Sequence, residues 1–309
     1  MMEWLSRRRG TALAVQGGGA HGAYAWGVLD ALLERGFAFE AASGVSSGAI
    51  TATMAAQGLA TGGTEGARRA MRGFWERVAG ADPFAAITDH LDRWLPGFEL
   101  GRGLGGSVAT QSLNALLGLF GAAAVNPLGQ NPLRPILADL VDPAALRLPA
   151  APRLHVGATA VETGAARIFR NHEITIDALL ASACLPMLFP AVEIDGVAYW
   201  DGAYSGNPPI APLLAEAPRD LVLIRAQSQM RPGVPTKPAD IVSRIEEIAF
   251  QSVVEAELTH LPGSVRLTQY GADAALAGLP PESRAKADRA FIEKLFEAGR
   301  AAVAIAEVA

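Results

Sequence analysis

The segment GVSSG at residues 44–48 is the feature that most constrains this chain, because it fits the pattern Gly-x-Ser-x-Gly. In that pattern a serine occupies a tight turn between a strand and a helix, and the glycines let neighbouring backbone approach. Residues 49–57 are rich in alanine and typical of a helix, which Gly58 is expected to close. Ser46 is therefore a candidate nucleophile near a positive helix end, and a purely structural glycine turn is the alternative.

A second glycine-rich loop, GGGAHG at residues 17–22, precedes this motif. It follows a short apolar strand at residues 11–16 and leads into an amphipathic helix at residues 23–35. Another extended segment, residues 37–42, then leads to Ser46. Two consecutive strand-turn-helix units predict an α/β protein with a mainly parallel sheet.

The glycine loop is compatible with two different functions. Gly17, Gly19 and Gly22 satisfy the dinucleotide-binding pattern G-x-G-x-x-G, and Glu40 lies near the place of a ribose-binding acid. The other function is an oxyanion hole, in which backbone N–H groups of Gly17, Gly18 and Gly19 bind the oxygen of a tetrahedral intermediate. We expect the oxyanion hole, because the second strand leads directly into the serine turn. A dinucleotide-binding or non-catalytic protein is the alternative.

Strand signals return in the second half of the chain. Residues 153–161 and 166–170 predict a hairpin, and residues 192–200 alternate around an Asp-Gly turn, which predicts a second one. This second hairpin ends at Asp201, which is followed by Gly202. The other elements expected are helices at residues 174–184, 239–260 and 282–306 and strands at 221–226 and 264–269.

Between these two halves, residues 60–148 show helical segments broken by glycine and proline and predict a helical cap insertion within a single domain, residues 1–309. Within this insertion, residues 103–135 are strongly apolar and contain Leu116 and Phe120. Such a face either packs on the sheet as core or lines an acyl-chain pocket that opens at a lipid surface. Leu116 and Phe120 are the candidate pocket residues.

Composition excludes several classes of protein. The chain has 309 residues, 50% of them hydrophobic, and a net charge of -5 without long charged runs, so no nucleic-acid partner is expected. The longest apolar run, residues 113–125, is shorter than the roughly 20 residues that a membrane-spanning helix needs. Cys184 is the only cysteine, so no internal disulfide can form, and a cytoplasmic location is expected. No spacing of His, Asp or Glu predicts a metal site, and the expected chemistry needs no cofactor.

Taken together, these motifs resemble those of the patatin-like phospholipase family. The loop at residues 17–22 matches the family's oxyanion loop, residues 44–48 match its nucleophile elbow, and residues 201–203 (DGA) match its Asp-Gly-Gly/Ala element. Residues 181–190 and the pair Asn207-Pro208 also resemble the block around the catalytic aspartate of that family. The resemblance covers residues 11–60 and 154–213, and its three main motifs fall in the family's order.

The resemblance implies a patatin-like three-layer α/β/α fold and a Ser-Asp dyad. Ser46 would attack an ester carbonyl, and Asp201 would take its proton directly. A carboxylate can serve as this base if burial raises its pKa toward the working pH. The implied activity is that of a phospholipase or lipid esterase, with a lipid ester as substrate and peripheral contact with a membrane as a further expectation.

Two histidines mark points where the assignment is open. The family often has Arg or Lys where this chain has His21, so we expect a neutral His21 that makes a local hydrogen bond. A Ser-His-Asp α/β-hydrolase would need a histidine near the end of the chain, and His260 is the best candidate. The order of the glycine loop and Ser46 favours the dyad over this triad.

Overall fold

The structure is a computed structural model, and it describes residues 10–80, 126, 129–186, 188–236 and 238–308. Eight strands in these ranges form one sheet in the order β5-β6-β3-β2-β1-β7-β8, and β4 also pairs with β3. Strands β3, β2, β1, β7 and β8 are parallel, and β4, β5 and β6 add antiparallel pairs. The strands are β1 (Thr11–Val15), β2 (Ala41–Gly44), β3 (Arg153–Ala160), β4 (Ala166–Arg170), β5 (Val192–Ile194), β6 (Val197–Asp201), β7 (Asp220–Arg225) and β8 (Arg266–Gly271).

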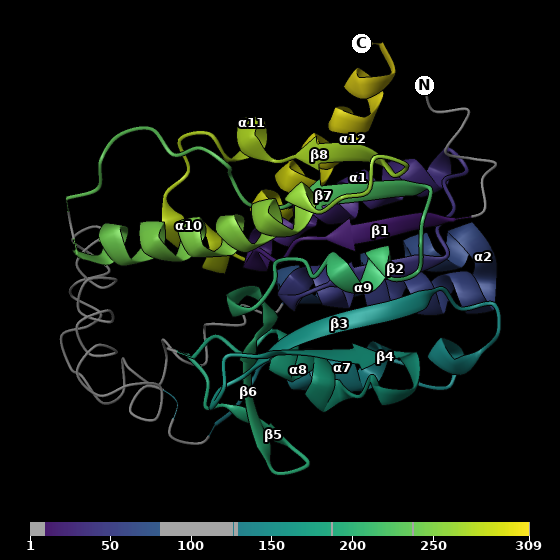
Figure 1. Cartoon of the computed structure of the whole chain (residues 1–309), viewed down its shortest axis with the longest axis horizontal. Helices are drawn as coiled ribbons and strands as arrows, with labels where there is room; N and C mark the ends of the chain where they lie inside the picture. The colour runs from purple at the N-terminus through teal and green to yellow at the C-terminus, as the bar shows by residue number, and fades with distance from the viewer. Residues whose placement is uncertain (1–9, 81–125, 127–128, 187, 237, 309) are drawn as a thin grey trace.

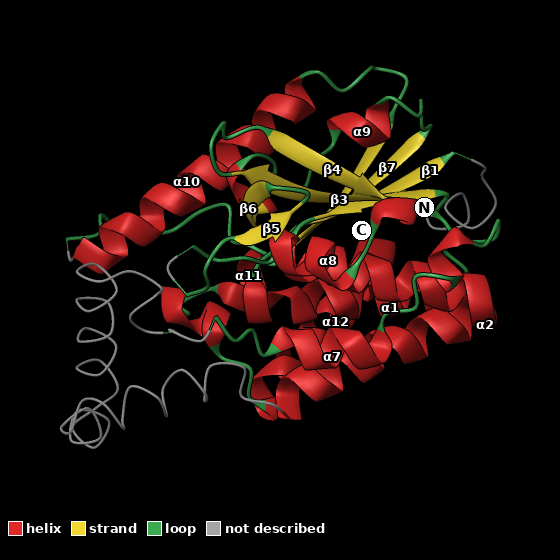
Figure 2. Ribbon diagram, turned by 90° about the horizontal axis from the view of Figure 1, so that it is seen from below, coloured by secondary structure: helices red, strands yellow, loops and turns green. Residues whose placement is uncertain are grey.

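Helices cover both faces of this sheet, so the predicted three-layer α/β/α fold is confirmed (Figures 1 and 2). The longer described helices are α1 (Gly22–Glu34), α2 (Ser46–Gly80), α7 (Leu133–Leu140), α8 (Ile176–Ser182), α10 (Pro238–Thr259) and α12 (Arg289–Val308). Two further α-helices, α9 (Ala211–Leu214) and α11 (Asp273–Leu276), are short. Single 3-10 turns are η2 (Gly19–His21), η3 (Ala145–Arg147), η4 (Asn171–Glu173), η5 (Gly202–Tyr204) and η6 (Pro281–Ala285).

The alternation of side chains along β1 divides the core into two layers. Leu13 and Val15 face the large apolar layer formed with α1, α2 and α12. Ala12 and Ala14 face a smaller layer that contains Val254 of α10. Because the C-terminal ends of β1 and β2 are paired side by side, the two glycine motifs that follow these strands meet at one edge of the sheet.

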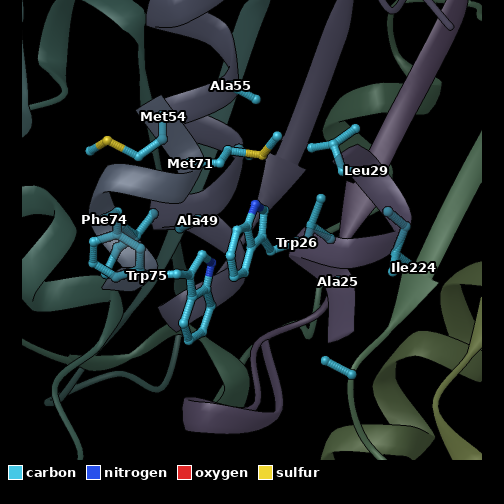
Figure 3. Packing of buried hydrophobic residues seen from close by; sticks show 14 of the residues in the cluster. Ala25, Trp26, Leu29, Ala49, Met54, Ala55, Met71, Phe74, Trp75 and Ile224 are labelled. Carbon is cyan, nitrogen blue, oxygen red and sulfur yellow. The ribbon is translucent and has the colours of Figure 1, made fainter. Parts of the chain in front are cut away.

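The larger layer is built around stacked aromatic side chains (Figure 3). The rings of Trp26 and Trp75 are stacked 6.3 Å apart and only 9° from parallel. Trp26 also lies 3.9 Å from the ring of Phe296, which ties α1 to α12. Met71 and Phe74 are likewise buried. Burial of each such large side chain contributes roughly 1.5–3 kcal/mol to stability.

Helix α2 departs from the sequence prediction, because Gly58 does not end it. The helix continues to Gly80, with a break in helical geometry at Gly62 and Gly63. An added Cβ at Gly58 would lie 2.5 Å from Cα of Ala67, so this glycine allows the two segments of α2 to pack closely. The helix breaks at Gly63, which has φ 60, because glycine adopts this conformation at little cost.

Two other predicted boundaries were wrong. The second strand begins at Ala41 and not at residue 37, and α12 begins at Arg289 after the η6 turn and not at residue 282. Both predicted hairpins are present, as β3-β4 and as β5-β6. Asp195 and Gly196 have φ values of 51 and 77 between β5 and β6, which is the left-handed turn that the Asp-Gly pair predicts.

Part of the predicted cap lies outside the described residues. The described parts, which include the second segment of α2 and helix α7, contribute Trp75 and Leu137 to the core. Leu116 and Phe120 fall in residues 81–125, so their place in an acyl-chain pocket stays a prediction. Among the described helices, none has the length and apolar character needed to cross a bilayer.

Candidate active site

Ser46 sits at the junction of β2 and α2 with φ 53, a left-handed backbone conformation that is uncommon for a residue with a side chain. Glycine is required on both sides of it. An added Cβ at Gly44 would lie 2.8 Å from the amide nitrogen of Ala49, and one at Gly48 would collide with the carbonyl oxygen of Val15. The turn is fixed by a hydrogen bond of 3.0 Å from the Ser46 N–H to Oγ of Ser182, the last residue of α8.

Asp201 ends β6 and lies against this turn. The residue before the serine, Val45, fits into the space left by Gly202, where an added Cβ would be 2.6 Å from Cγ1 of Val45. The Asp201 backbone is held at both of its polar groups. Its N–H donates to the carbonyl oxygen of Cys184 at 2.8 Å, and its carbonyl accepts from Oγ1 of Thr159 at 2.8 Å. The structure therefore brings Ser46 and Asp201 together although 155 positions separate them in the sequence (201 − 46).

The electrostatics of Asp201 suit a proton acceptor. Its side chain is only 2% exposed, and burial raises its pKa from 3.8 to about 7. Hydrogen bonds to the N–H of Ala203, at 2.9 Å, and to the Ser46 hydroxyl oppose this rise, and the nearby Glu246 adds to it. A carboxyl group with a pKa near 7 exchanges its proton readily at neutral pH.

The glycine loop packs directly on the nucleophile. An added Cβ at Gly17 would lie 2.8 Å from Cβ of Ser46, so only glycine fits there. The N–H of Gly17 donates to Oδ1 of Asn207 at 2.7 Å, and the N–H of Gly18 donates to Oγ of Ser47 at 3.2 Å. Gly17 and Gly18 are buried, whereas Gly19 is exposed, and its N–H donates to none of the described residues.

His21 is buried at the end of this loop, where its Nε2 is 2.8 Å from Oγ of Ser283. Burial, with a smaller contribution from the positive charge of Arg284, lowers the pKa of His21 from 6.5 to about 4. The histidine is therefore neutral at neutral pH and makes a local hydrogen bond, as expected from the sequence. The loop is backed here by η6, because an added Cβ at Gly19 would collide with the carbonyl oxygen of Arg284.

A second carboxyl group near Asp201 was not found from the sequence. Glu246 lies on α10, and burial raises its pKa, while Arg284 and a hydrogen bond from Tyr204 lower it. The Tyr204 ring makes an edge contact with Phe250 of the same helix at 5.2 Å. No local motif marks Glu246, since its position near Asp201 depends on how α10 packs across the sheet.

The structure also separates several candidates from this site. His260 is exposed at the end of α10, and its Nδ1 lies 2.9 Å from the carbonyl oxygen of Ala256, within its own helix. Glu40 precedes β2, whereas the glycine loop follows β1. The two are thus at opposite ends of paired parallel strands, which removes the predicted ribose contact. Cys184 is buried, and burial raises its thiol pKa to about 12, so it is a core residue.

The described residues contain no group of three or more His, Cys, Asp or Glu side chains placed to hold a metal ion. Their arrangement offers a serine in a strained turn, a buried carboxyl group beside it and a glycine loop in which Gly19 is exposed. Sequence patterns marked all three. They did not predict the hydrogen bonds that fix these groups, from Ser46 to Ser182 and from Gly18 to Ser47, although both partner serines lie within the motifs at residues 181–190 and 44–48.

Three comparisons with known proteins were made, by sequence, by structure and against family models. A sequence search of curated proteins finds no significant match. Among solved structures, VipD from Legionella pneumophila is similar with a TM-score of 0.41 and 17% identity, over 96% of this chain and 68% of that one. ExoU from Pseudomonas aeruginosa, solved in full length with SpcU, is similar with a TM-score of 0.31 and 16% identity, over 94% of this chain and 52% of that one.

The family comparison covers most of the elements described above. A sequence model of the patatin-like phospholipase family matches residues 13–214, which include the end of β1, the glycine loop, the Ser46 turn, Asp201 and Asn207. The match supports a lipid hydrolase function. On this evidence the chain belongs to the patatin-like phospholipase family.

Proposed function

We propose that the chain is a serine acyl hydrolase that cleaves lipid esters with Ser46 and Asp201 as a catalytic dyad. The observation that carries the proposal is the buried Asp201, whose pKa is raised to about 7 beside a serine held in a strained turn. A carboxylate of ordinary pKa would be too weak a base for a serine hydroxyl at neutral pH. In this site the base needs no histidine between it and the nucleophile.

The reaction follows from the positions of these groups. Oγ of Ser46 attacks the ester carbonyl while its proton passes to Asp201, and the carbonyl oxygen becomes an oxyanion. Collapse of this intermediate breaks the bond to the alcohol, which takes the proton from Asp201. Water then attacks the acyl-serine ester, again giving its proton to Asp201. The fatty acid leaves as Ser46 recovers its hydrogen.

The oxyanion needs N–H donors that are not already bonded. In the predicted set of Gly17, Gly18 and Gly19, the first two N–H groups donate to Asn207 and Ser47. We therefore assign the role to the exposed N–H of Gly19, aided by the positive N-terminal end of α2 that begins at Ser46.

The dyad is tested by replacing the nucleophile. We expect Ser46→Ala to lower kcat on a p-nitrophenyl ester by at least about 10³-fold, because the acyl-enzyme can no longer form. A fluorophosphonate should label the unaltered protein, with the label found on Ser46 by peptide mapping. Ser264→Ala is the control for labelling, since it removes an exposed serine that precedes β8, at the end of the parallel strands opposite to Ser46. Turnover by Ser46→Ala at the unaltered rate would exclude the proposal.

The proposed substrates are lipid esters, taken up at a membrane surface. Exposed apolar side chains on α10, namely Ile241, Val242, Ile245 and Ile248, support contact with lipid because this helix also carries Glu246 and Phe250 toward the site. The measurement compares hydrolysis of a short soluble ester with that of phospholipid in vesicles. Turnover of the soluble ester alone would contradict the proposal that lipids are the substrates, and it would still support an esterase activity.

A further inference from the structure

Asn207 is fully buried and joins the segment after Asp201 to the glycine loop. Its side-chain amide pairs with both polar groups of one residue. Oδ1 accepts from the Gly17 N–H at 2.7 Å, and Nδ2 donates to the Gly17 carbonyl at 3.4 Å. Its own carbonyl oxygen accepts from Nε2 of Gln16 at 3.3 Å. A side-chain amide can donate one hydrogen bond and accept another at the same time. Neither Asp nor Leu can therefore replace both bonds.

The amide of Gln227, two residues after the end of β7, holds the same loop. Nε2 of Gln227 donates to the Gly17 carbonyl at 2.8 Å, and the Gln227 N–H donates to Oε1 of Gln16 at 2.9 Å. Gly17 is therefore held by Asn207 at its N–H and by both amides at its carbonyl. The loop cannot rotate about this residue without breaking a buried hydrogen bond, which would leave a buried polar group without a partner.

We propose that Asn207 is a positioning residue that sets the glycine loop against Ser46 and leaves the N–H of Gly19 as the oxyanion donor. The inference rests on the proposed function. Asn207 lies six positions after Asp201 (207 − 201), so one short segment carries the base and fixes the loop. Because an oxyanion donor is effective only near 3 Å from the developing charge, a loop released at Gly17 would lose transition-state stabilisation.

The test replaces Asn207 with Leu, which has a similar volume and no hydrogen-bonding group. We expect kcat on a soluble p-nitrophenyl ester to fall about 100-fold, with KM changed less than about threefold, because only the transition state is affected. Gln227→Leu should lower kcat by less, about tenfold, since Asn207 still holds both groups of Gly17. Hydrogen exchange in residues 16–20 should increase in both variants.

Asn171→Leu is the control for loss of a half-buried side-chain amide that joins backbone segments. The Asn171 side chain accepts from the Leu154 N–H at 2.7 Å and donates to the carbonyl oxygens of Leu146 and Pro152, at 2.9 Å each. It therefore joins backbone segments in the same manner without contacting the glycine loop or the dyad. We expect this variant to lose stability and to keep kcat within about threefold, when each protein is assayed well below its Tm.

The outcomes separate the two claims. Suppose that fluorophosphonate labels the unaltered protein and that the Asn207→Leu and Asn171→Leu variants have the same kcat. This result would overturn the positioning role of Asn207 and leave the proposed dyad intact. Absence of labelling and turnover in the unaltered protein would overturn both. Should Asn207→Leu fail to fold, Asn207→Ser decides the question, because its hydroxyl is too short to bond both polar groups of Gly17. An unchanged kcat and unchanged exchange of residues 16–20 in that variant would also overturn the role.

Discussion

Two buried regions of this molecule are stabilised in different ways. In the layer between the sheet and helices α1, α2 and α12, large apolar side chains such as Trp26 and Leu29 are almost completely excluded from solvent. Near the ends of β1, β2 and β6, the equally buried groups are polar, and they include Asp201, Asn207 and Ser182. The apolar layer gains free energy from burial itself, whereas the polar region must recover its desolvation cost through hydrogen bonds.

We therefore expect stability and activity to depend on different regions of the molecule. The polar region holds two unfavourable features, the left-handed backbone at Ser46 and a carboxyl group whose pKa is raised by burial. Such features persist only when surrounding structure holds them in place. The apolar layer supplies the free energy that offsets these two features. Substitutions in the two regions should therefore affect stability differently and, in one case, in opposite directions.

The largest expected effect comes from Asp201→Asn, which should lower activity while raising stability. Loss of the base should reduce kcat by about 10²–10⁴-fold. Asn is nearly the same size, and its Oδ1 can still accept from the Ala203 N–H. The measurements are kcat on a soluble ester and the free energy of unfolding at several pH values.

The sign of the stability change follows from the pKa of Asp201, which is raised from 3.8 to about 7. Its protonated form is favoured in the folded state, so this contribution to stability is complete below pH 3.8 and is lost as pH rises through 7. The shift corresponds to about 4 kcal/mol at pH 8. We expect Asp201→Asn to unfold at a higher Tm than the unaltered protein at pH 8, with the difference vanishing near pH 4. A variant less stable at pH 8 would contradict the raised pKa.

The next effect in size concerns the apolar layer. Trp26 is 1% exposed and contacts Trp75 and Phe296, so Trp26→Ala should lower the free energy of unfolding by about 3–5 kcal/mol. Below its Tm the variant should keep kcat within about threefold, because none of these rings touches the dyad. Denaturant unfolding and ester hydrolysis measured on one preparation would check both parts. A large loss of kcat in the folded variant would break the division between the two regions.

The sequence predicted the parts of the site that depend on local patterns. The Ser46 turn, the glycine loop and the Asp-Gly pair are short motifs whose backbone conformations are indicated by their glycines. The mainly parallel α/β sheet followed from strand-turn-helix order, and the three-layer arrangement was implied by the family resemblance. These predictions needed no information on contacts between distant residues.

What the sequence could not predict were contacts made across the chain. The bonds from Gly17 to Asn207 and from Ser46 to Ser182 join residues 190 and 136 positions apart. The positions of Asn207 and Ser182 in the sequence do not indicate which backbone groups they bond. The prediction that Gly58 ends the helix was wrong for a related reason. The sequence does not distinguish a glycine that lets two helical segments pack closely from one that ends a helix.

The smallest expected effect concerns His21, which lies between the two regions. It borders the glycine loop, yet it is buried beside Phe291, 6.2 Å away between ring centres, and bonded to Ser283. With a pKa lowered to about 4, it carries no charge at neutral pH. We expect His21→Gln to change kcat less than about threefold and to leave the acid limb of the pH-rate profile, assigned to Asp201, in place.

Stability should show the one detectable consequence of this change. Because the folded-state pKa of His21 is lowered from 6.5 to about 4, its contribution is present above pH 6.5 and is lost as pH falls through 4. Gln cannot take up a proton, so the difference in unfolding free energy between the two proteins should shrink by about 1–2 kcal/mol between pH 7 and pH 5. A constant difference over this range, measured by denaturant unfolding, would mean that His21 titrates normally. A charged imidazolium would then lie beside the glycine loop at pH 5, and the acid limb of the rate profile would have to be reassigned.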